Sequence, residues 1–286
     1  MKLKYLLAIS WLIATASYAE IAEHHIHEDR TSITLNYEFL DFTGSKQKDD
    51  GIRYGVEVDY QAKKHHFQLY SEHTDTQTKP VIPKDLSVNK YAFKYQYQLF
   101  PSQTLSLSYI HVSDNLIKEV DGGNIYGLGY RYKAFSFTQY LSDYHHFDVY
   151  QSDFKWGIKK KFSHFILKGA LIGKYMYLDN KDSNAFSSKA EDDYFTVGAK
   201  IHAMYEGWHL SLVGYTGERI FAVMNEGLRV QHHAMAFDKS MMLGLGKEWG
   251  NVFVKLRYIK QYATEVPIDN DDVKVENIAL SLEYTF

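Results

Sequence analysis

The sequence predicts an all-β fold, an up-and-down antiparallel β-barrel of about fourteen strands that crosses a membrane. Three observations support this prediction. Apolar and polar residues alternate along most of the chain, which is the two-residue period of a strand with two different faces. The connections between alternating segments are long and short in turn, as in transmembrane barrels. The composition is rich in tyrosine, with 24 residues, and has only 4 prolines.

The beginning of the chain has the features of a secretory signal peptide. Met1-Lys2-Leu3-Lys4 is a short basic start, residues 5–16 are mostly apolar, and Ser17-Tyr18-Ala19 is a small-x-small cleavage site. The apolar core is too short to span a bilayer. We therefore expect residues 1–19 to be removed, residues 20–30 to form an N-terminal lead, and residues 31–286 to form one barrel domain.

Composition and charge narrow the possible classes. The chain has no cysteine, so hydrogen bonding rather than disulfides must hold the fold. A net charge of -3 argues against a nucleic-acid partner, which would favour a basic surface. The mean hydropathy of -0.37 is that of a soluble protein, but barrel strands hide half of their residues from lipid. A large soluble β-sandwich with an aromatic core is the alternative fold.

The alternating segments can be placed individually. They lie near 31–42, 52–61, 65–74, 87–99, 103–113, 123–132, 135–142, 148–160, 164–177, 193–204, 208–216, 240–249, 251–263 and 275–286. Residues 217–239 contain two further strand-like pieces, Ile220 to Val223 and Leu228 to Val230, which would make sixteen strands. Each piece is shorter than the roughly 9–11 residues of a spanning strand. We expect 217–239 to be a long outer loop that extends beyond the membrane or folds into the mouth.

The last twelve residues carry the most specific pattern. Every second residue back from the C-terminus is apolar, namely Ile278, Leu280, Leu282, Tyr284 and Phe286. This ending resembles the C-terminal strand of bacterial outer-membrane β-barrel proteins, where a terminal Phe and alternate apolar residues are recognised by the barrel-assembly machinery. Aromatic residues also gather at the short-turn ends of the segments, as an interfacial girdle requires.

The resemblance implies a location and a function. In length and strand number the chain is similar to a small monomeric porin of a Gram-negative outer membrane, with both termini periplasmic. The expected function is passive diffusion of ions and small hydrophilic solutes, with no cofactor and no catalytic residue. The expected partners are outer-membrane lipid, lipopolysaccharide and the assembly machinery. The alternatives are a surface hydrolase of lipase or protease type and a closed-lumen structural or adhesive barrel.

The face opposite the apolar one should line the lumen, because charges are tolerated beside water and not in lipid. The basic residues of that face are Arg53, Lys90, Lys94, Arg131, Lys155, Lys159, Lys168, Lys174, Lys200, Lys255 and Arg257. The acidic ones are Glu38, Glu57, Asp59, Glu72, Asp153, Glu248 and Glu283. The acids concentrate early in the chain, which predicts an acidic arc and a basic arc with a transverse field between them. Pairing across strands would instead make them a solvated wall.

Two motifs favour the hydrolase alternative. His209-Leu210-Ser211 has the His-x-Ser spacing of outer-membrane phospholipases, and period two places both groups on one face. The following Asn-Gly-Arg run of that family is absent, and Asn251 is only a nominal third member. Asp143, His145, His146 and Asp148 cluster in one short outer loop, where imidazole and carboxylate could hold a water. Ordinary lumen residues and a solvated loop tip are the competing interpretations.

Histidines and tyrosines suggest further roles. His24, His25 and His27 are weak candidates for a metal site on the N-terminal lead, and no other metal site is expected. His232-His233 could make loop 217–239 a pH-responsive gate. Inward packing of Tyr70, Tyr140, Tyr194 and Tyr215 would favour a closed lumen over a conducting one.

Overall fold

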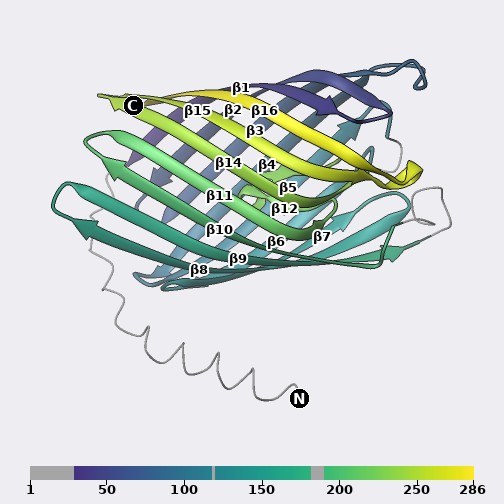
Figure 1. The fold of residues 1–286 in the computed structure, drawn as a ribbon. Helices are drawn as coiled ribbons and strands as arrows, with labels where there is room; N and C mark the ends of the chain where they lie inside the picture. The colour runs from purple at the N-terminus through teal and green to yellow at the C-terminus, as the bar shows by residue number, and fades with distance from the viewer. Residues whose placement is uncertain (1–28, 118–119, 182–189) are drawn as a thin grey trace, which may run out of the picture.

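The computed structural model describes residues 29–117, 120–181 and 190–286. Fourteen antiparallel strands form a closed barrel, in which each strand pairs with its neighbours along the chain (Figure 1). The first and last wall strands close the barrel, with Leu35 of one opposite Leu282 of the other. The predicted up-and-down barrel is therefore confirmed, and a sandwich is excluded because no sheet edge is left open.

The bounds of the elements follow the alternating segments closely. The wall strands are β1 (Arg30–Thr43), β2 (Lys48–Ala62), β3 (His65–Thr78), β4 (Leu86–Phe100), β5 (Gln103–Asp114), β6 (Asn124–Tyr132), β7 (Phe135–Asp143), β8 (Phe147–Phe162), β9 (Phe165–Asn180), β10 (Asp193–Tyr205), β11 (Trp208–Arg219), β14 (Met235–Trp249), β15 (Val252–Glu265) and β16 (Asn270–Thr285). A short hairpin, β12 (Val223–Met224) and β13 (Arg229–Val230), pairs only with itself. The helical turns η1 (Asn225–Gly227) and η2 (Val266–Ile268) complete the described elements.

All fourteen expected segments are wall strands, and their connections alternate as expected. Two-residue turns join β2 to β3, β4 to β5 and β6 to β7 at one end of the barrel, and β8 to β9, β10 to β11 and β14 to β15 at the same end. Lys63, Lys133 and Glu206 begin three of these turns with φ of 49°, 52° and 46°, the left-handed backbone of tight hairpins. The chain enters β1 and leaves β16 at this short-turn end.

The strands extend farther into the long-loop end than the alternating pattern predicts. β2 begins at Lys48 rather than near 52, β9 ends at Asn180 rather than near 177, and β16 begins at Asn270 rather than near 275. Most of these added residues are polar, and the two apolar ones, Leu178 and Val273, are too isolated to extend the alternating pattern. They still pair because the neighbouring strand satisfies their backbone hydrogen bonds.

The outer surface of the barrel is apolar. Leu35, Leu107, Leu171 and Leu256 expose 52%, 52%, 55% and 53% of their surface, far more than a water-soluble wall would present in one belt. Trp208, Trp249 and Phe286 are similarly exposed at the short-turn end, where the aromatic girdle was expected. None of the helices in the described ranges is long and apolar enough to cross a membrane.

The chain between β11 and β14, residues 220–234, turns into the barrel and is called the inserted segment here. Its hairpin lies inside the outline of the wall (Figure 1). β11 and β14 pair directly with each other, with register breaks at Thr216/Arg219 and Phe237/Lys239 where the segment leaves the wall. The sixteen-strand alternative is therefore wrong. Of the two courses expected for 217–239, the chain takes the second: it folds into the mouth and does not extend beyond the membrane.

The inserted segment enters because its apolar residues have partners on the inner wall. At the long-loop end, the inward positions of the strands change from charged to apolar. Together with the segment they form a buried cluster, the apolar cap, whose members include Leu86, Val88, Ile110, Val112, Ile125, Phe147, Val149, Met176, Leu178, Tyr194, Ile220, Phe221, Ala222, Val223, Leu228 and Val230. The cap closes this half of the lumen by the same burial of apolar surface that forms a soluble core.

Candidate functional site

A charged cavity of about 810 Å³ lies inside the barrel, bounded on one side by the inserted segment. Alternation places the charges there, since every second residue of a strand points inward. All eleven of the expected basic residues line it: Arg53, Lys90, Lys94, Arg131, Lys155, Lys159, Lys168, Lys174, Lys200, Lys255 and Arg257. Counting Lys133, Arg219 and Arg229, fourteen lysines and arginines face five carboxylates, so the cavity is strongly basic.

The expected acidic residues divide into two groups. Glu38, Glu57, Glu72 and Asp153 line the cavity. Asp59, Glu248 and Glu283 lie nearer the short-turn end, outside its lining. Each of these three has a basic neighbour: His66 at 2.6 Å from Asp59, His209 at 2.8 Å from Glu248 and Arg30 at 3.2 Å from Glu283.

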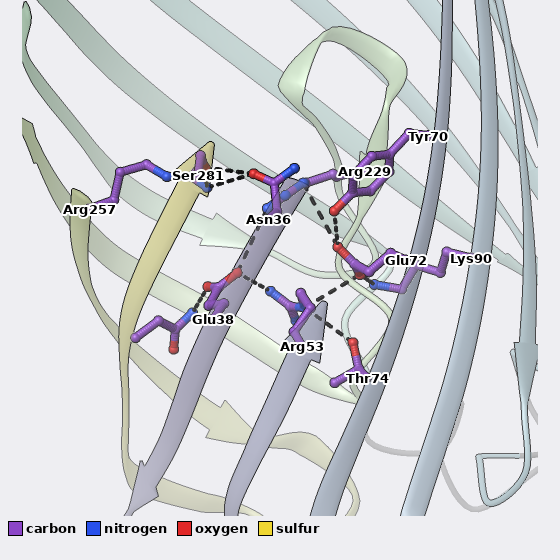
Figure 2. Close-up of polar contacts among 11 residues, drawn as sticks. Asn36, Glu38, Arg53, Tyr70, Glu72, Thr74, Lys90, Arg229, Arg257 and Ser281 are labelled. Atoms are coloured by element: carbon purple, nitrogen blue, oxygen red, sulfur yellow. Dashed lines mark hydrogen bonds and ion pairs between the residues drawn. The ribbon is translucent and has the colours of Figure 1, made fainter. Parts of the chain in front are cut away.

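The acidic side of the cavity is a closed network of ion pairs centred on Glu72, shown in Figure 2. Lys90 Nζ donates to Glu72 at 2.6 Å, and Arg53 Nε lies 3.4 Å from the same carboxylate. Tyr70 donates its hydroxyl to the other oxygen of Glu72 at 2.7 Å. The Glu72 side chain is only 1% exposed, so its charge is balanced by these neighbours and not by water.

Glu38 extends this network toward the barrel closure. Its carboxylate accepts from Arg53 Nη1 at 3.2 Å and from Asn277 Nδ2 at 2.7 Å, across β2 and β16. Asn36 continues the chain, accepting from Ser281 Oγ at 2.6 Å and from Arg257 Nη2 at 3.4 Å. Glu38 and Glu72 are thus neutralised within the wall, as pairing across strands requires.

The basic side of the cavity is different. Within the described residues, the side chains of Lys159, Lys168, Lys200 and Lys255 have no hydrogen bond or ion pair. Other cations of the same strands are paired, such as Lys174, which donates to Asp153 at 2.5 Å, and Lys155, which binds Glu226. The four unpaired lysines of β8, β9, β10 and β15 therefore present an unbalanced positive field to whatever enters the cavity.

The inserted segment is fastened to both sides of the cavity by polar contacts. Its β12 backbone is bound at Val223, whose N–H donates to Gln151 Oε1 at 2.7 Å and whose carbonyl accepts from Lys174 Nζ at 2.9 Å. Farther along, Glu226 forms an ion pair with Lys155 and lies 3.7 Å from Lys94. The tip thus places a negative charge against the basic side.

Arg229 binds the opposite side. Its guanidinium lies 3.9 Å from both Glu38 and Glu72 and 5.0 Å above the Tyr70 ring (Figure 2). Burial alone would lower the pKa of Arg229, but Tyr70, Glu72 and Glu38 raise it. Burial likewise would raise the pKa of Glu226, yet Lys155 and Lys94 hold it at about 2. Both groups are charged at neutral pH, so the tip aligns with the transverse field of the cavity.

The C-terminal end of the inserted segment contains His232 and His233, which are 1% and 6% exposed. Lys48 Nζ lies 3.1 Å from His233 Nδ1, and Phe42 packs edge-on against the same ring at 5.6 Å. Burial, followed by the positive charges of Lys48, Arg53 and Lys90, lowers the pKa of His232, and burial and Lys48 do the same for His233. Both rings are neutral at pH 7 and charging them opposes docking.

The hydrolase motifs do not converge. His209 and Ser211 do face inward, but His209 interacts with His202 at 3.1 Å, and Ser211 Oγ donates to the Gly244 carbonyl at 3.4 Å. In the outer-loop cluster, Asp143 and Asp148 bind Lys181 at 2.6 and 2.8 Å. No group of three metal-ligating side chains is found within the described ranges, and His24, His25 and His27 lie outside them.

The sequence reasoning missed the residues that fasten the inserted segment, namely Gln151, Glu226 and Arg229. One signal pointed to them. The inward positions of β4, β5 and β9 become apolar toward the long-loop end, with Val88, Val112 and Leu178 at positions that a water-filled mouth would make polar. An apolar inner rim needs an apolar partner, and the run Ile220 to Val223 supplies it.

Comparison with known proteins identifies the fold and no sequence family. No protein-family model matches the sequence, and no curated protein matches it. The outer membrane protein Omp33 of Acinetobacter baumannii is similar in structure with a TM-score of 0.51 and 11% identity, covering 91% of this chain and 99% of that one. A structure described as a bacterial polysaccharide outer membrane secretin has a TM-score of 0.56 and 8% identity, covering 90% and 98%. The chain therefore has the barrel fold of bacterial outer-membrane proteins.

Proposed function

We propose that this protein is an outer-membrane channel through which ions and small hydrophilic solutes diffuse passively. The observation that carries the proposal is the charged cavity inside a closed barrel with an apolar outer face. The cavity lysines that have no ion pair in the described residues, such as Lys168 and Lys200, are stable only beside water or a charged solute. A wall of fourteen strands encloses more space than its own side chains fill, which an eight-stranded barrel does not.

The proposed location is the outer membrane of a Gram-negative bacterium, and both similar structures are described as outer-membrane proteins. The signal peptide of residues 1–19 would direct export. The C-terminal pattern of Ile278, Leu280, Leu282, Tyr284 and Phe286 would be read by the barrel-assembly machinery. Phospholipid and lipopolysaccharide would contact the apolar belt, and the short-turn end with both termini would face the periplasm.

The charge balance of the cavity predicts the preferred ion. Fourteen cations against five carboxylates give a positive potential, and two of the carboxylates, Glu38 and Glu72, are already neutralised by their neighbours. A ring of unbalanced lysines attracts anions and repels cations, as in other anion-conducting pores. We therefore expect a channel with moderate anion preference.

The inserted segment would be the gate of this channel. In the described structure it fills the long-loop half of the lumen through the apolar cap, while the charged cavity lies beyond it. Passage from one side to the other requires the hairpin tip to move. Its fastenings are a few polar contacts and ion pairs, and the wall ladder beside it is continuous without it.

A specific observation favours a second function, a closed structural or adhesive barrel. Tyr70, Tyr140 and Tyr194 pack inward and are only 4%, 2% and 3% exposed, which is the arrangement expected of a sealed lumen. In that case the long loops would be the functional surface, and the cavity would be a solvated interior without passage.

Planar-bilayer recording separates these functions. Residues 20–286 would be refolded and compared with a variant in which 223–230 is replaced by a Gly/Ser stretch of equal length. We expect brief steps from the natural chain, larger and longer steps from the variant, and a reversal potential of anionic sign in a salt gradient. Silence from both proteins, with each folded by heat-modifiable migration, would contradict the channel and favour the closed barrel.

A further inference from the structure

The tip of the inserted segment has an unusual backbone. Asn225, Glu226 and Gly227 have φ of 49°, 56° and 98°, three consecutive residues in the left-handed region. Glycine accepts this conformation freely, whereas glutamate adopts it only at a cost in free energy. Such a conformation persists where surrounding contacts enforce it, and it often marks a functional position. Here it aims one carboxylate into the basic side of the cavity.

Glu226 lies in surroundings that suit a free carboxylate. Lys155 and Lys94 come from separate strands, β8 and β4, and both have their ammonium groups beside its oxygens. The Glu226 side chain is nevertheless 58% exposed to the lumen, whereas Lys94 is only 6% exposed. The cations are thus a fixed part of the wall, and the carboxylate between them remains accessible to exchange.

Further cations line the same side of the cavity. Lys159, Lys168, Lys200 and Lys255 have no hydrogen bond or ion pair anywhere in the described parts of the chain. Four unpaired ammonium groups in one enclosed space repel each other, so an anion entering the cavity relieves that repulsion. Glu226 neutralises one part of this surface and leaves the rest free.

We infer that the cavity holds a binding site for small organic dicarboxylates, in which one solute carboxylate takes the place of Glu226 between Lys94 and Lys155. The second carboxylate would lie among Lys159, Lys168, Lys200 and Lys255. This inference rests on the proposed channel function and names its substrate class. Glu226 is thus an internal ligand that competes with the solute.

Competition also links the solute to the gate. When a solute carboxylate binds Lys94 and Lys155, the tip loses its ion pairs on the basic side of the cavity. The contacts that hold its left-handed backbone in place are then weakened. Arg229 on the opposite side remains bound to the Glu72 network. The solute thereby favours release of the segment that blocks its own path.

Binding is measured by titration calorimetry of the whole refolded barrel in detergent, with succinate as the probe and neutral succinamide as its uncharged counterpart. The decisive variant is Glu226→Gln, and its matched control is Glu57→Gln, which removes the same charge from the same cavity but on the acidic side. If Glu226 occupies the site nine-tenths of the time, its removal tightens succinate binding about tenfold. Glu57→Gln should change the affinity by less than about twofold.

Lysine variants test the other half of the site. Lys155→Met should weaken succinate binding about tenfold, whereas Lys133→Met, a lysine of the same cavity that lies over the Tyr132 ring, should have little effect. Equal affinities in the Glu226→Gln and Glu57→Gln variants overturn the inference. So does succinamide binding as tightly as succinate, or inorganic phosphate binding as tightly with the same variant dependence.

The failure of this inference differs from failure of the channel. Calorimetry in detergent detects the site whether or not the barrel conducts, and bilayer recording in chloride detects conduction whether or not succinate binds. A conducting barrel that ignores succinate would sink only the dicarboxylate site. A silent barrel that binds succinate with the predicted variant dependence would sink only the channel.

Discussion

The two sides of the cavity are built from the same kinds of charged residue and differ in how those charges are balanced. On β1 to β4, Glu38, Glu72, Arg53 and Lys90 lie within 3.4 Å of an opposite charge and are almost fully enclosed. On β8, β9, β10 and β15, four lysines have no partner in the described residues. The ion pairs of β1 to β4 link neighbouring strands. The unpaired lysines of β8, β9, β10 and β15 leave a positive potential in the cavity that would attract an anionic solute.

Charged residues that line the same lumen can therefore serve two different roles, one in stability and one in the electrostatic potential. A buried pair contributes mainly when it is broken, because the surviving charge is left without water or partner. An unpaired cation beside water contributes little to stability and much to the local potential. The inserted segment contacts both sides of the cavity, so changes on either side should alter its docking.

The largest effect is expected from Glu72→Gln. This change leaves Lys90 and Arg53 enclosed without their central anion, and should lower the free energy of unfolding by about 3–5 kcal/mol. Urea unfolding in lipid vesicles, followed by tryptophan fluorescence, measures it. The control is Glu57→Gln, whose only hydrogen bond in the described chain is a 3.4 Å contact from Gln68, and which should cost less than about 1 kcal/mol. Equal losses would mean that the ion pairs of Glu72 contribute nothing beyond the charge of one lumen carboxylate.

Acidification should release the inserted segment. Its buried histidines have pKa values lowered below the ordinary 6.5, so the released segment binds protons that the docked one does not. Docking is therefore fully stable above pH 6.5 and weakens as pH falls below it, by about 1 kcal/mol per histidine at pH 5.5. Glu226, with a pKa of about 2, stays charged in this window.

Open probability in bilayers between pH 7.5 and 5.5 measures this release, which we expect to increase toward acid. The positive charges of Lys48, Arg53 and Lys90 face these rings and oppose their protonation in the docked state, so the two histidines carry the expected effect. A double variant, His232→Gln with His233→Gln, should remove the pH dependence. A gate that opens toward alkaline pH instead would contradict the sign of the argument.

Arg229→Gln should release the tip of the inserted segment from the acidic side of the cavity. The change removes two 3.9 Å charge contacts and a ring contact at 5.0 Å, which together stabilise docking by about 1–2 kcal/mol. That corresponds to a roughly tenfold rise in open probability, measured in planar bilayers. Arg30→Gln, which removes an exposed pair with Glu283 at the short-turn end, is the control and should leave gating unchanged.

The smallest effect on stability is expected from substitutions on the basic side of the cavity. Lys200→Gln combined with Lys255→Gln should change the free energy of unfolding by less than about 0.5 kcal/mol, because no ion pair is lost. The same variant should shift the reversal potential toward zero in a salt gradient. Loss of several kcal/mol would mean that these lysines have structural partners.

The wall of this barrel was predictable from the sequence because strand alternation is enforced by two different solvents. Lipid outside and charge inside fix which face each residue takes, so all fourteen segments and the inward side of residues such as Lys155 and Lys200 follow from period two. The added strand ends near Asn180 and Asn270 were not predictable, since most of their residues are polar and the two-residue alternation is lost there.

The inserted segment was not predictable in the same way. Ile220 to Val223 and Leu228 to Val230 were recognised as strand-like, but their partners come from many strands, which a one-dimensional pattern does not place together. Glu226 and Arg229 have ordinary neighbours in sequence, and only the closed wall brings them to opposite charges. The roles of the lumen charges and of the C-terminal pattern stay predictions until conduction and assembly are measured.

Because β11 pairs directly with β14, the barrel wall is complete without the inserted segment. The wall ladder runs past the departure points at Arg219 and Met235 as though the intervening residues were a simple hairpin loop. Substitutions, insertions and deletions between these points therefore leave strand number and closure untouched. Sequence changes in this segment can therefore alter what the lumen admits while the barrel is preserved. The same separation would let an engineer replace the segment with peptides of different chemistry.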